Sequence, residues 1–593
     1  MRTWGPGLLL VSPSILLIGF FVYGLIGWSA NISTTNQNSR FERAPGTVAD
    51  AHIGLSNYTT LFASQDFIQS LKHLGILAAV YIGGALFFGM LWALLLEKGV
   101  RAEGLFRAVY LFPMAVSMFA SGVVWNWLLN SDTGSGASGL NQLFDMTGLG
   151  FLKNQWWVSS PTWGIAAIAL PAVWQLSGYI MALFLAGFRG IPGELREAAR
   201  IDGASEFQLY RHVLFPQLSP IALSALIILG HMSLKMFDII MAISGEKNVY
   251  TSVPMVTMWD PDRTAGLCQG GCSRHDPAGA SGVAGRALPR PHLSPGEELV
   301  TTDVIPAPVA TELNRKRKNT PRSQAARTVK YVLLIIFMLI VLIPAYVLIV
   351  TSFKSFTEAL SPNRWALPSG LSFEGWSAAW AELSPALGRT LLIAIPAAAI
   401  SSMLGAMNGF VLSRWRFPGA NLVFTLMLFG MFIPYQAVMV PLLEFLPMTG
   451  LGRGVPQLLA VHVVYGIPIC TLIFRNYYQT TVPMELIEAG RVDGAGLLRT
   501  FRSLILPLSL PGFVVTLIWQ FTSVWNDYLF AVFLSSKDNG PVILGLANLA
   551  GSQIVPYPEV FAGALIVTAP TLLVYILLGR WFVGGLMAGA VKS

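Results

Sequence analysis

The stretch EAARIDGASEF, at residues 197–207, returns as EAGRVDGAGLL at residues 488–498. Each copy is a run of polar and small helix-forming residues that ends in Asp-Gly. The correspondence continues on both sides without a gap, because the prolines at 192, 216 and 220 recur at 483, 507 and 511, each 291 residues further on. A single register held over about 30 residues indicates that the chain consists of two homologous halves.

The chain is too apolar for a water-soluble protein. Of its 593 residues, 54% are hydrophobic and 11% are charged, whereas a soluble domain carries about 25% charged residues. We therefore expect an all-α polytopic membrane protein. The net charge of +8 does not indicate nucleic-acid binding, because the basic residues stand in short loops beside apolar segments, as in the cytoplasmic loops of membrane proteins.

Eleven apolar segments reach the length of about 20 residues that a membrane span requires. Five lie in the first half, at residues 7–30, 72–96, 105–129, 163–188 and 220–243, and six lie in the second half, at residues 329–352, 389–413, 421–446, 455–475, 512–534 and 562–582. Each is expected to be a helix, because backbone groups in lipid must bond within their own segment. The first segment is too long for a cleaved signal peptide and predicts an uncleaved span.

Arginine and lysine orient these spans, because basic residues concentrate in cytoplasmic loops. They cluster in four connections: Lys98, Arg101 and Arg107; Arg189, Arg196, Arg200 and Arg211; Arg414 and Arg416; and Arg475, Arg491, Arg499 and Arg502. All four connections become cytoplasmic if each half begins inside the cell. The connections 31–71 and 354–388, which are poorer in basic residues, then face outward. Both copies of the repeated stretch are therefore expected on the cytoplasmic side.

The repeated stretch predicts two short helices outside the membrane. Gly203 ends the first helix, because glycine tolerates the left-handed backbone that follows many helices. Ser205 and Gln208 have the spacing of a capping box at the start of the second helix. Glu197 lies one turn before Arg200 and can reach it. The second copy has no serine at the equivalent position, so its second helix is expected to begin less sharply.

The pattern E-A-A, then D-G-A, then a proline 19 residues after the glutamate resembles the cytoplasmic loop of ABC importer permeases. The surrounding sequence LAGFRGIPGELREAARIDGASEFQLYRHVLFPQLSP is similar to the carbohydrate-importing branch, of the maltose, α-glucoside or glucose type. GHMSLKMFDIIMAISG and YTSVPMVTMWD in the first half resemble one permease subunit, and SVWNDYLFAVFLSS and FVGGLMAGAVKS in the second resemble its partner. The resemblance covers residues 1 to about 260 and about 325 to 593, so the chain looks like two permease subunits fused.

This resemblance implies a role for the two repeated loops, residues 190–219 and 480–511. In the family, such a loop docks into a cleft on an ATPase subunit, and closure of the ATPase dimer turns the cavity from inward-facing to outward-facing. The resemblance therefore assigns ATPase coupling to Glu197, Ala198, Ala199, Asp202 and Gly203, and to Glu488, Ala489, Gly490, Asp493 and Gly494. Gly490 stands where the family pattern usually has alanine.

The expected partners follow from the same resemblance. No G-x-x-x-x-G-K-[ST] phosphate loop occurs in the chain, so ATP is expected to bind to a separate ATPase subunit. The chain itself is then not an enzyme and needs no cofactor. The resemblance also implies an extracytoplasmic sugar-binding protein, a sugar substrate and a location in the bacterial cell membrane.

The first half lacks a sixth span. After five spans its end would lie outside, whereas the second half, preceded by the basic run NRKRKNTPRSQAARTVK, must begin inside. Residues 262–300 are rich in Gly, Pro and Arg and cannot span lipid. Residues 261–327 are either a flexible linker or, as we favour, the lost helix translated in a wrong frame where two genes fused. The two halves are then residues 1–260 and 328–593.

Cysteine chemistry is not expected to matter. The three cysteines, Cys268, Cys272 and Cys470, give no disulfide framework. Cys268, Cys272 and His275 stand close together, but they are only three candidate ligands in a segment of accidental character, so no metal site is expected.

Polar and aromatic residues within the spans mark a candidate sugar pathway, because such residues are costly in a membrane and sugars need hydrogen-bond partners and flat aromatic faces. The candidates are Trp174, Gln175, Tyr179, Lys235 and Asp238 in the first half and Tyr435, Gln436, Trp525, Asn526 and Asp527 in the second, with His231, His462 and Tyr465 of similar character. The alternative for each residue is packing between helices. Lys235 and Asp238 are also spaced to pair with each other. Asp238 and Asp527 lie near span ends, where gating or binding-protein contact is an alternative role.

Two other classes of function compete with an importer permease. An ion-driven secondary transporter fits the internal duplication and the intramembrane Asp and His residues, but the strongest duplicated signal is an exposed loop rather than a broken helix. A membrane-embedded enzyme would need a catalytic motif, and neither H-E-x-x-H nor G-x-S-x-G occurs. The leading hypothesis is therefore the permease of an ATP-driven sugar importer. The sequence does not determine which sugar.

Overall fold

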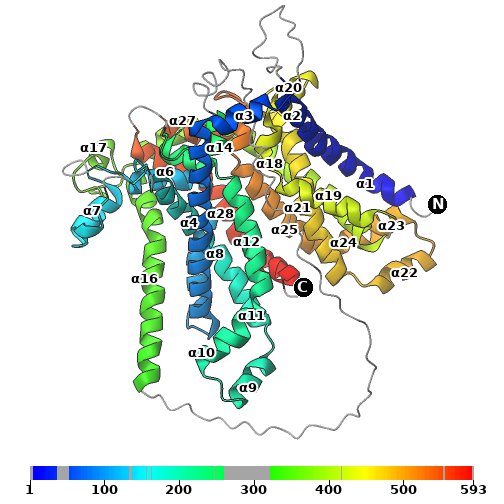
Figure 1. Ribbon diagram of the computed structural model, residues 1–593, viewed down its shortest axis with the longest axis horizontal. Helices are drawn as coiled ribbons and strands as arrows, with labels where there is room; N and C mark the ends of the chain where they lie inside the picture. The colour runs from blue at the N-terminus through cyan, green and yellow to red at the C-terminus, as the bar shows by residue number, and fades with distance from the viewer. Residues whose placement is uncertain are drawn as a thin grey trace, which may run out of the picture.

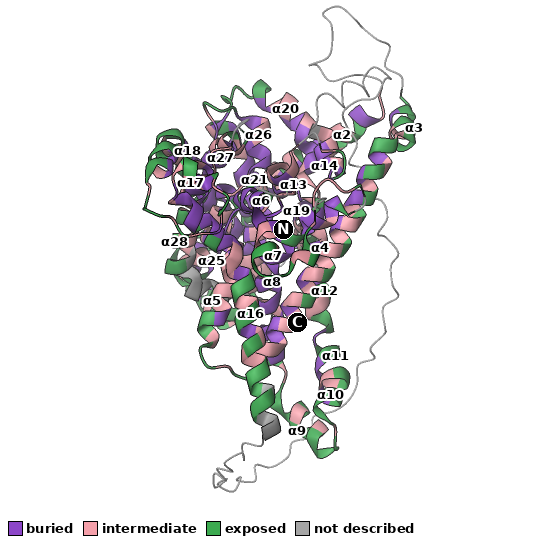
Figure 2. Ribbon diagram, turned by 90° about the vertical axis from the view of Figure 1, so that its left-hand side faces the viewer, coloured by how far each residue is buried: buried purple, intermediate pink, exposed green. Residues whose placement is uncertain are grey.

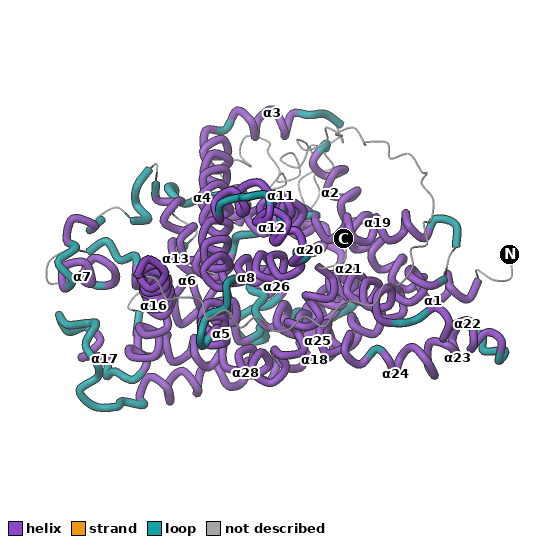
Figure 3. The backbone as a smooth tube through the Cα atoms, turned by 90° about the horizontal axis from the view of Figure 1, so that it is seen from below, coloured by secondary structure: helices purple, strands orange, loops and turns teal. Residues whose placement is uncertain are grey.

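The computed structural model describes residues 5–35, 53–132, 137–154, 157–161, 163–245, 248–259, 321–415, 417–551 and 555–590. Within these ranges every regular element is a helix (Figure 3). The expected all-α architecture is therefore confirmed. Of the proposed frameshift or linker segment, residues 261–320, with Cys268, Cys272 and His275, lie outside the described residues, whereas residues 321–327 form the start of a helix.

The helices of the first half are α1 (Gly5–Ile18), η1 (Gly19–Gly24), α2 (Leu25–Ser33), α3 (Ser56–Ala63), α4 (Gln65–Glu97), α5 (Glu103–Leu111), η3 (Phe112–Ala115), α6 (Met118–Leu128), α7 (Gly139–Met146), η5 (Gly150–Leu152), α8 (Gly164–Gly190), α9 (Gly193–Ile201), α10 (Glu206–Gln208), η6 (Leu209–Leu214), α11 (Phe215–Gln217), α12 (Ser219–Leu234), α13 (Asp238–Ser244) and α14 (Pro254–Trp259). Those of the second half are α16 (Pro321–Ser352), α17 (Phe356–Ala359), α18 (Glu374–Arg414), α19 (Ala420–Phe432), η8 (Tyr435–Val438), α20 (Met439–Met448), α21 (Val455–Thr481), α22 (Met484–Val492), α23 (Leu497–Thr500), η9 (Phe501–Ile505), α24 (Leu506–Leu508), α25 (Leu510–Trp525), α26 (Leu529–Leu534), α27 (Val542–Ala550) and α28 (Tyr557–Ala590).

The predicted number of spans is confirmed within the described residues. Seven continuous helical segments are long and apolar enough to cross a membrane, and four further pairs of helices qualify if each bent pair counts as one span. The eleven candidates fall five in the first half and six in the second, as expected.

The prediction that residues 105–129 and 421–446 are straight spans is wrong. The chain turns by 98° between α5–η3 and α6, and by 97° between α19 and η8–α20. In the second half, Ile433 precedes Pro434 and takes an extended conformation, because proline disfavours the α region for the residue before it. In the first half, the extended Ser117 starts a new helix by accepting a hydrogen bond from the Ala120 N–H at 3.0 Å.

The prediction that residues 220–243 and 512–534 are continuous spans is also wrong. The helix stops after Leu234 and resumes at Asp238, and in the second half it stops after Trp525 and resumes at Leu529. Polar residues stand at both breaks, Lys235 in the first half and Asn526 and Asp527 in the second. Asp527 Oδ2 accepts a hydrogen bond from the Phe530 N–H at 3.0 Å at the start of α26. Both halves therefore contain interrupted helices. The sequence argument against a secondary transporter, which relied on the lack of a broken helix, no longer holds.

The duplication holds in three dimensions as well as in sequence. The helices α8 and α21, α9 and α22, and α12 and α25 begin and end 291 residues apart. The helices α4 and α18 end 317 residues apart, and α5 and α19 begin at that same offset. The offset changes because residues 129–163, which connect α6 to α8, form a much longer segment than residues 449–454, which connect α20 to α21.

The first helix of each half packs against the other half (Figure 1). Helix α1 lies along α18, α19 and α21, and the Tyr23 hydroxyl donates to the Leu426 carbonyl at 2.7 Å. Helix α16 lies against α5 and α6, where the Tyr110 hydroxyl donates to the Leu334 carbonyl at 2.8 Å. Each half therefore contributes one helix to the packing of the other half.

Buried side chains concentrate in the middle of the molecule, whereas the region of α9–α11 is exposed (Figure 2). The largest core cluster includes residues of both halves, from α4, α6 and α8 to α27 and α28. A second cluster joins α1 to α18, α21 and the helices α22–α23. The repeated loop of the first half contributes Leu209, Leu214 and Leu218 to the largest cluster, and that of the second half contributes Ile487, Leu497, Phe501 and Ile505 to the second cluster.

Candidate functional site

The two repeated loops share one backbone design. We refer to residues 190–219 as the first loop and residues 480–511 as the second loop. In the first loop, the Ala204 N–H donates to the Ala199 carbonyl at 2.9 Å and the Gly203 N–H donates to the Arg200 carbonyl at 3.2 Å. This pattern is a Schellman motif, and it requires the positive φ of +80° that Gly203 adopts. The prediction that Gly203 ends the first helix in the left-handed conformation is confirmed.

The second loop repeats that geometry at the same register. The Ala495 N–H donates to the Gly490 carbonyl at 2.9 Å, the Gly494 N–H donates to the Arg491 carbonyl at 3.0 Å, and φ of Gly494 is +74°. Both glycines face open space, so a side chain there would meet no neighbour. The backbone conformation, rather than crowding, is what restricts each position to glycine.

Each loop carries two large apolar side chains beside its glycine turn and exposes both. Ile201 is 84% exposed and Phe207 is 72% exposed. Their equivalents 291 residues later, Val492 and Leu498, are 88% and 65% exposed. Glu197, Asp202, Glu488 and Asp493, to which the resemblance assigned coupling, are exposed on the same segments. A repeated apolar pair next to repeated carboxylates is typical of a surface that binds a protein partner.

The helices that follow the turns begin differently, as predicted. Ser205 and Gln208 form the complete capping box of α10, with the Ser205 N–H donating to Gln208 Oε1 at 2.8 Å. The equivalent Gly496 has no side chain with which to cap α23. Beyond these starts both loops contain a π-helical turn, η6 and η9, at matching positions, and such turns are frequent at functional sites.

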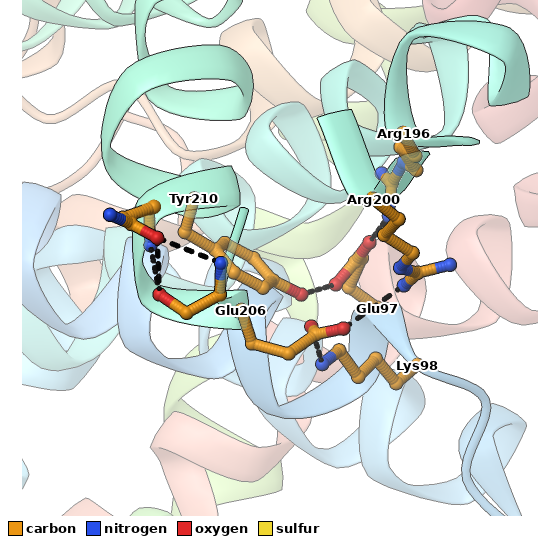
Figure 4. Close-up of polar contacts among 8 residues, drawn as sticks. Glu97, Lys98, Arg196, Arg200, Glu206 and Tyr210 are labelled. Atoms are coloured by element: carbon orange, nitrogen blue, oxygen red, sulfur yellow. Dashed lines mark hydrogen bonds and ion pairs between the residues drawn. The ribbon is translucent and has the colours of Figure 1, made fainter. Parts of the chain in front are cut away.

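Polar contacts attach the first loop to the end of α4 (Figure 4). Glu97, the last residue of α4, accepts hydrogen bonds from the Arg196 guanidinium and from the Tyr210 hydroxyl. Next to it, Lys98 Nζ lies 2.7 Å from one carboxylate oxygen of Glu206, and Arg200 Nη2 lies 3.1 Å from the other. The hydrogen bond from Lys98 lowers the pKa of Glu206 below its ordinary value. We call these six residues the polar clamp.

The expected contact of Glu197 with Arg200 does not form. The Arg200 guanidinium turns instead to Glu206 in the next helix, which leaves the Glu197 carboxylate exposed. A carboxylate without an internal partner is available to a docking subunit. The sequence signal for the polar clamp was weak, because Glu97 and Tyr210 are 113 residues apart in the chain.

Apolar packing attaches the second loop instead. Ile487, Leu497 and Phe501 are 0%, 4% and 5% exposed and belong to the core cluster that contains α1, α18 and α21. These three residues are the equivalents of Arg196, Glu206 and Tyr210. The Arg491 guanidinium lies 4.4 Å from the centroid of the Trp415 ring, which adds a cation–π contact. Between described residues of this loop and the core there is no ion pair.

The glycine at position 490 has a packing reason. It is buried, and a Cβ there would lie 2.9 Å from Cδ1 of Leu504. The equivalent residues of the first loop are Ala199 and Val213, so the larger leucine of the second loop faces the smaller glycine. The departure from the usual alanine therefore reflects close packing of α22 on η9.

Comparison with known proteins agrees with these features. Residues 85–253 and 400–584 each match the family described as binding-protein-dependent transport system inner membrane component. The chain belongs to this family.

Several relatives align with less than half of the length of this permease, and the aligned region covers most of each relative's own length. A probable ABC transporter permease protein of Pyrococcus horikoshii is 38% identical over 39% of this chain and 76% of its own length. The diacetylchitobiose uptake system permease protein NgcG of Streptomyces coelicolor is 32% identical over 47% of this chain and 93% of its own length. The glucose import system permease protein GlcU of Saccharolobus solfataricus is 30% identical over 44% and 92%. This chain therefore contains two permease units in tandem.

One solved structure, of a bacterial ABC transporter involved in the import of the acidic polysaccharide alginate, matches 44% of this permease and 98% of that chain. The identity is 20% and the TM-score is 0.38.

Within the permease, some of the predicted pathway residues meet where the two halves face each other. Lys235 Nζ lies 3.7 Å from the centroid of the Tyr435 ring and donates to the Met431 carbonyl at 3.4 Å, rather than pairing with Asp238. His462 Nε2 lies 3.6 Å from Asp527 Oδ2. We call this group, together with Asp238, Gln436 and Asn526, the interfacial cluster.

The polar groups of the interfacial cluster are incompletely bonded. Gln436 is 3% exposed, and within the described residues neither its amide nitrogen nor its amide oxygen has a hydrogen-bond partner. The side-chain oxygen of Asn526 is likewise buried without a partner there. Buried polar atoms of this kind call for an explanation, such as a ligand or water that bonds to them.

Four of the predicted pathway residues pack between helices instead. The Trp174 indole donates to the Val341 carbonyl at 2.9 Å and the Gln175 amide donates to the Val116 carbonyl at 2.6 Å. The Trp525 indole donates to the Val567 carbonyl of α28 at 2.9 Å. Tyr179 is half-buried against the main core cluster. These contacts agree with the packing alternative, although Gln175 Oε1 is buried without a hydrogen-bond partner among the described residues.

Proposed function

We propose that this permease forms the translocation pathway of an ATP-driven sugar importer and is moved by a separate ATPase that grips the two loops. The observation that carries the proposal is the repetition, in the same register, of the glycine turn, the exposed carboxylates and the exposed apolar pair. A transporter driven by ions does not need two equivalent loops outside the membrane for the binding of an ATPase. The chain itself would have no catalytic activity and would bind no cofactor.

Coupling in this proposal falls to Glu197, Ala198, Ala199, Asp202 and Gly203 in the first loop and to Glu488, Ala489, Gly490, Asp493 and Gly494 in the second. The exposed residues Ile201, Phe207, Val492 and Leu498 would enter apolar clefts on the two ATPase subunits. The Schellman turn would fix the angle between the docking helix and the helix that leads back to the membrane. Movement of the docking helix by the ATPase would then be transmitted to the helix that leads back to the membrane.

The names of the relatives favour a sugar as substrate. They include permeases for diacetylchitobiose, for xylose and arabinose, for glucose and for melibiose, raffinose and stachyose. An extracytoplasmic binding protein that delivers the sugar is part of the proposal, because the family is one of binding-protein-dependent systems. So is a location in the bacterial cell membrane with both loops in the cytoplasm.

The interfacial cluster is our candidate for the sugar pathway. It combines aromatic rings, charged groups and the unpartnered amide of Gln436 at the meeting of the halves, where alternating access requires a passage. The members of this cluster that the sequence predicts as pathway residues are Lys235, Asp238, Tyr435, Gln436, Asn526 and Asp527. We further propose that residues 1–260 and 328–593 act as the two permease halves and that residues 261–327 only join them.

The proposed docking is tested by cross-linking. Single cysteines at Ile201 and Val492, in a chain whose native cysteines are replaced by serine, are expected to form disulfides with cysteines placed in the clefts of the cognate ATPase, and ATP is expected to change their yield. Cysteines at Met146 and Phe151 are the controls, because these residues are 59% and 80% exposed but lie outside both loops. If only the controls react, the docking proposal is wrong.

The transport role is tested by reconstitution. The permease, its ATPase and its binding protein are placed in liposomes, and sugar-stimulated ATP hydrolysis and sugar uptake are measured together. Uptake that requires ATP and rises with the loaded binding protein supports an importer. Uptake that proceeds without ATP in response to an ion gradient would instead support a secondary transporter.

A further inference from the structure

The polar clamp joins the first loop to α4, the long span that packs along α8 and α12. Its inner part consists of Glu97, Arg196 and Tyr210, and the side chain of Glu97 is only 4% exposed. Its outer part consists of Lys98, Arg200 and Glu206, whose side chains are 51–53% exposed. Three of these hydrogen bonds and ion pairs join the loop to Glu97 or Lys98 at the end of α4, and the one between Arg200 and Glu206 lies within the loop. The clamp is therefore a polar link between the loop and that span.

The two parts of the polar clamp differ in strength. Exposed ion pairs are screened by water and salt and contribute little. A carboxylate with 4% exposure is different, because removing its partners leaves a desolvated charge, which is costly. The inner part therefore holds the loop to α4, and the outer part adds a contribution that depends on ionic strength.

The second half shows the same joint without an ion pair between described residues. The equivalents of Glu97 and Lys98, at the offset of 317 residues, are Arg414 and Trp415. The Arg414 guanidinium donates to the carbonyls of Tyr478 and Val482 near the end of α21. The equivalents of Arg196, Glu206 and Tyr210 are buried apolar residues. At those three positions the first loop uses polar side chains and the second uses apolar ones, although their backbones match.

We propose that the polar clamp transmits movement of the first loop to α4, so that coupling through the first half depends on ionic strength and coupling through the second half does not. Glu97, Arg196 and Tyr210 are positioning residues in this proposal, because they hold the loop rather than touch sugar or ATP. A push on α9 passes through Arg196 to Glu97 and tilts the end of α4. The inference rests on the proposed function, since it concerns how one of the two loops is attached.

The test measures sugar transported per ATP hydrolysed by the reconstituted importer. Glu97→Gln and Arg196→Met are expected to lower this ratio about fivefold, the lower end of common coupling effects. Lys98→Glu and Glu206→Lys are expected to lower it less. The double variant Lys98→Glu/Glu206→Lys is expected to recover part of the loss, because it rebuilds the ion pair between positions 98 and 206 but places a second positive charge beside Arg200. The loss of coupling in the wild type is expected to grow as salt rises from about 50 to about 500 mM.

Two controls separate the clamp from general effects of charge and folding. Lys153→Gln breaks an exposed ion pair with Asp145, 2.5 Å long and outside both loops, and is expected to change nothing. Failure of the charge-swapped double variant to improve on its single parents, or a ratio that ignores salt, would overturn the clamp. If a single clamp variant fails to insert into the membrane, the double variant Lys98→Glu/Glu206→Lys still tests the clamp, because it keeps one positive and one negative charge at these two positions.

The outcome also distinguishes the clamp from the proposed function. Gly203→Val lowers transport if the first loop couples to an ATPase by any means. If Gly203→Val abolishes transport while all clamp variants transport normally, the clamp proposal is wrong and the proposed importer function is retained. If Gly203→Val and Gly494→Val both leave transport intact, the proposed function is wrong as well.

Discussion

The first and second loops have the same backbone and different attachments. Each runs through a helix, a Schellman turn at glycine and a π-helical turn. At the positions of the polar clamp the first is attached by polar and charged side chains, and the second by Ile487, Leu497 and Phe501 within an apolar cluster. The first loop also buries Leu209, Leu214 and Leu218 in the main core cluster. The comparison teaches that the geometry presented to a partner and the means of holding it are specified separately. Backbone shape is set by one glycine, whereas the attachment is set by side chains that reach other helices.

The largest effect is expected from substitution of the turn glycines that the two loops share. Gly203→Val or Gly494→Val places a β-branched residue at a φ of +80° or +74°, which is strained by roughly 1–3 kcal/mol and misdirects the docking helix. Each single variant is expected to lower ATP-driven uptake at least about tenfold, since the strain acts on the coupling geometry. Gly193→Ala is the control, because that glycine is helical and a Cβ there meets nothing. Unequal losses at the two glycines would show that the loops do not contribute alike.

The next effect is specific to the second loop. Ile487→Ala opens a cavity under α22 and is expected to cost about 2–4 kcal/mol of local stability. Leu195→Ala in the first loop removes a side chain that is 40% exposed and is expected to cost much less. Hydrogen–deuterium exchange of residues 483–500 and 192–209 in the two variants measures the difference. Equal exchange would contradict the view that α22 depends more on apolar packing than α9 does.

A smaller effect compares α12 with α25 inside the membrane region. Ile518 is 1% exposed and packs near Val574 of α28, whereas its equivalent Ile227 is 49% exposed, with no described helix over that face. Ile518→Ala is expected to cost roughly 1–2 kcal/mol, below the usual range for buried isoleucine, because lipid is as apolar as the lost contact. Ile227→Ala is expected to leave the Tm in detergent or nanodiscs unchanged. A matching fall in Tm for both variants would mean that the two faces are equally covered.

The smallest effect is a pH dependence confined to the first loop. The pKa of Glu206 is lowered in the folded protein, so its contribution to holding the loop is present above the ordinary glutamate pKa of about 4.3 and is lost as the pH falls through the lower folded value. Spin labels on Ala198→Cys and Ala489→Cys are expected to report rising mobility only for the first as the pH falls below about 5. Glu206→Gln removes this response if the assignment is correct.

Much of the fold was predictable because it depends on contiguous residues. Hydropathy located all eleven candidate spans, and the 291-residue register placed α8, α9 and α12 on α21, α22 and α25. The breaks at Lys235–Phe237 and Asn526–Tyr528 were missed, since the segments are apolar enough overall to count as single spans. Polar residues in the middle of an apolar run were the available signal for them.

The candidate site was predictable only in part. The glycine turns and the capping box of Ser205 with Gln208 follow from local residue preferences and were anticipated. The polar clamp and the interfacial cluster were not, because their members are brought together from distant parts of the chain. Trp174 and Gln175 looked like pathway residues for the same reason, since a sequence does not reveal which helix a polar group faces.

The sequence by itself determined the class of protein, the number of spans, the duplication and the shape of each loop. These depend on hydropathy and on backbone preferences of residues near one another in the chain. Only the tertiary structure decided that α1 and α16 change places between the halves, that α5–α6 and α19–α20 turn through nearly a right angle, and that equivalent positions of the two loops make polar contacts in one half and apolar contacts in the other. Those outcomes depend on which surfaces meet once the helices assemble, and contacts between residues hundreds of positions apart leave no local signal.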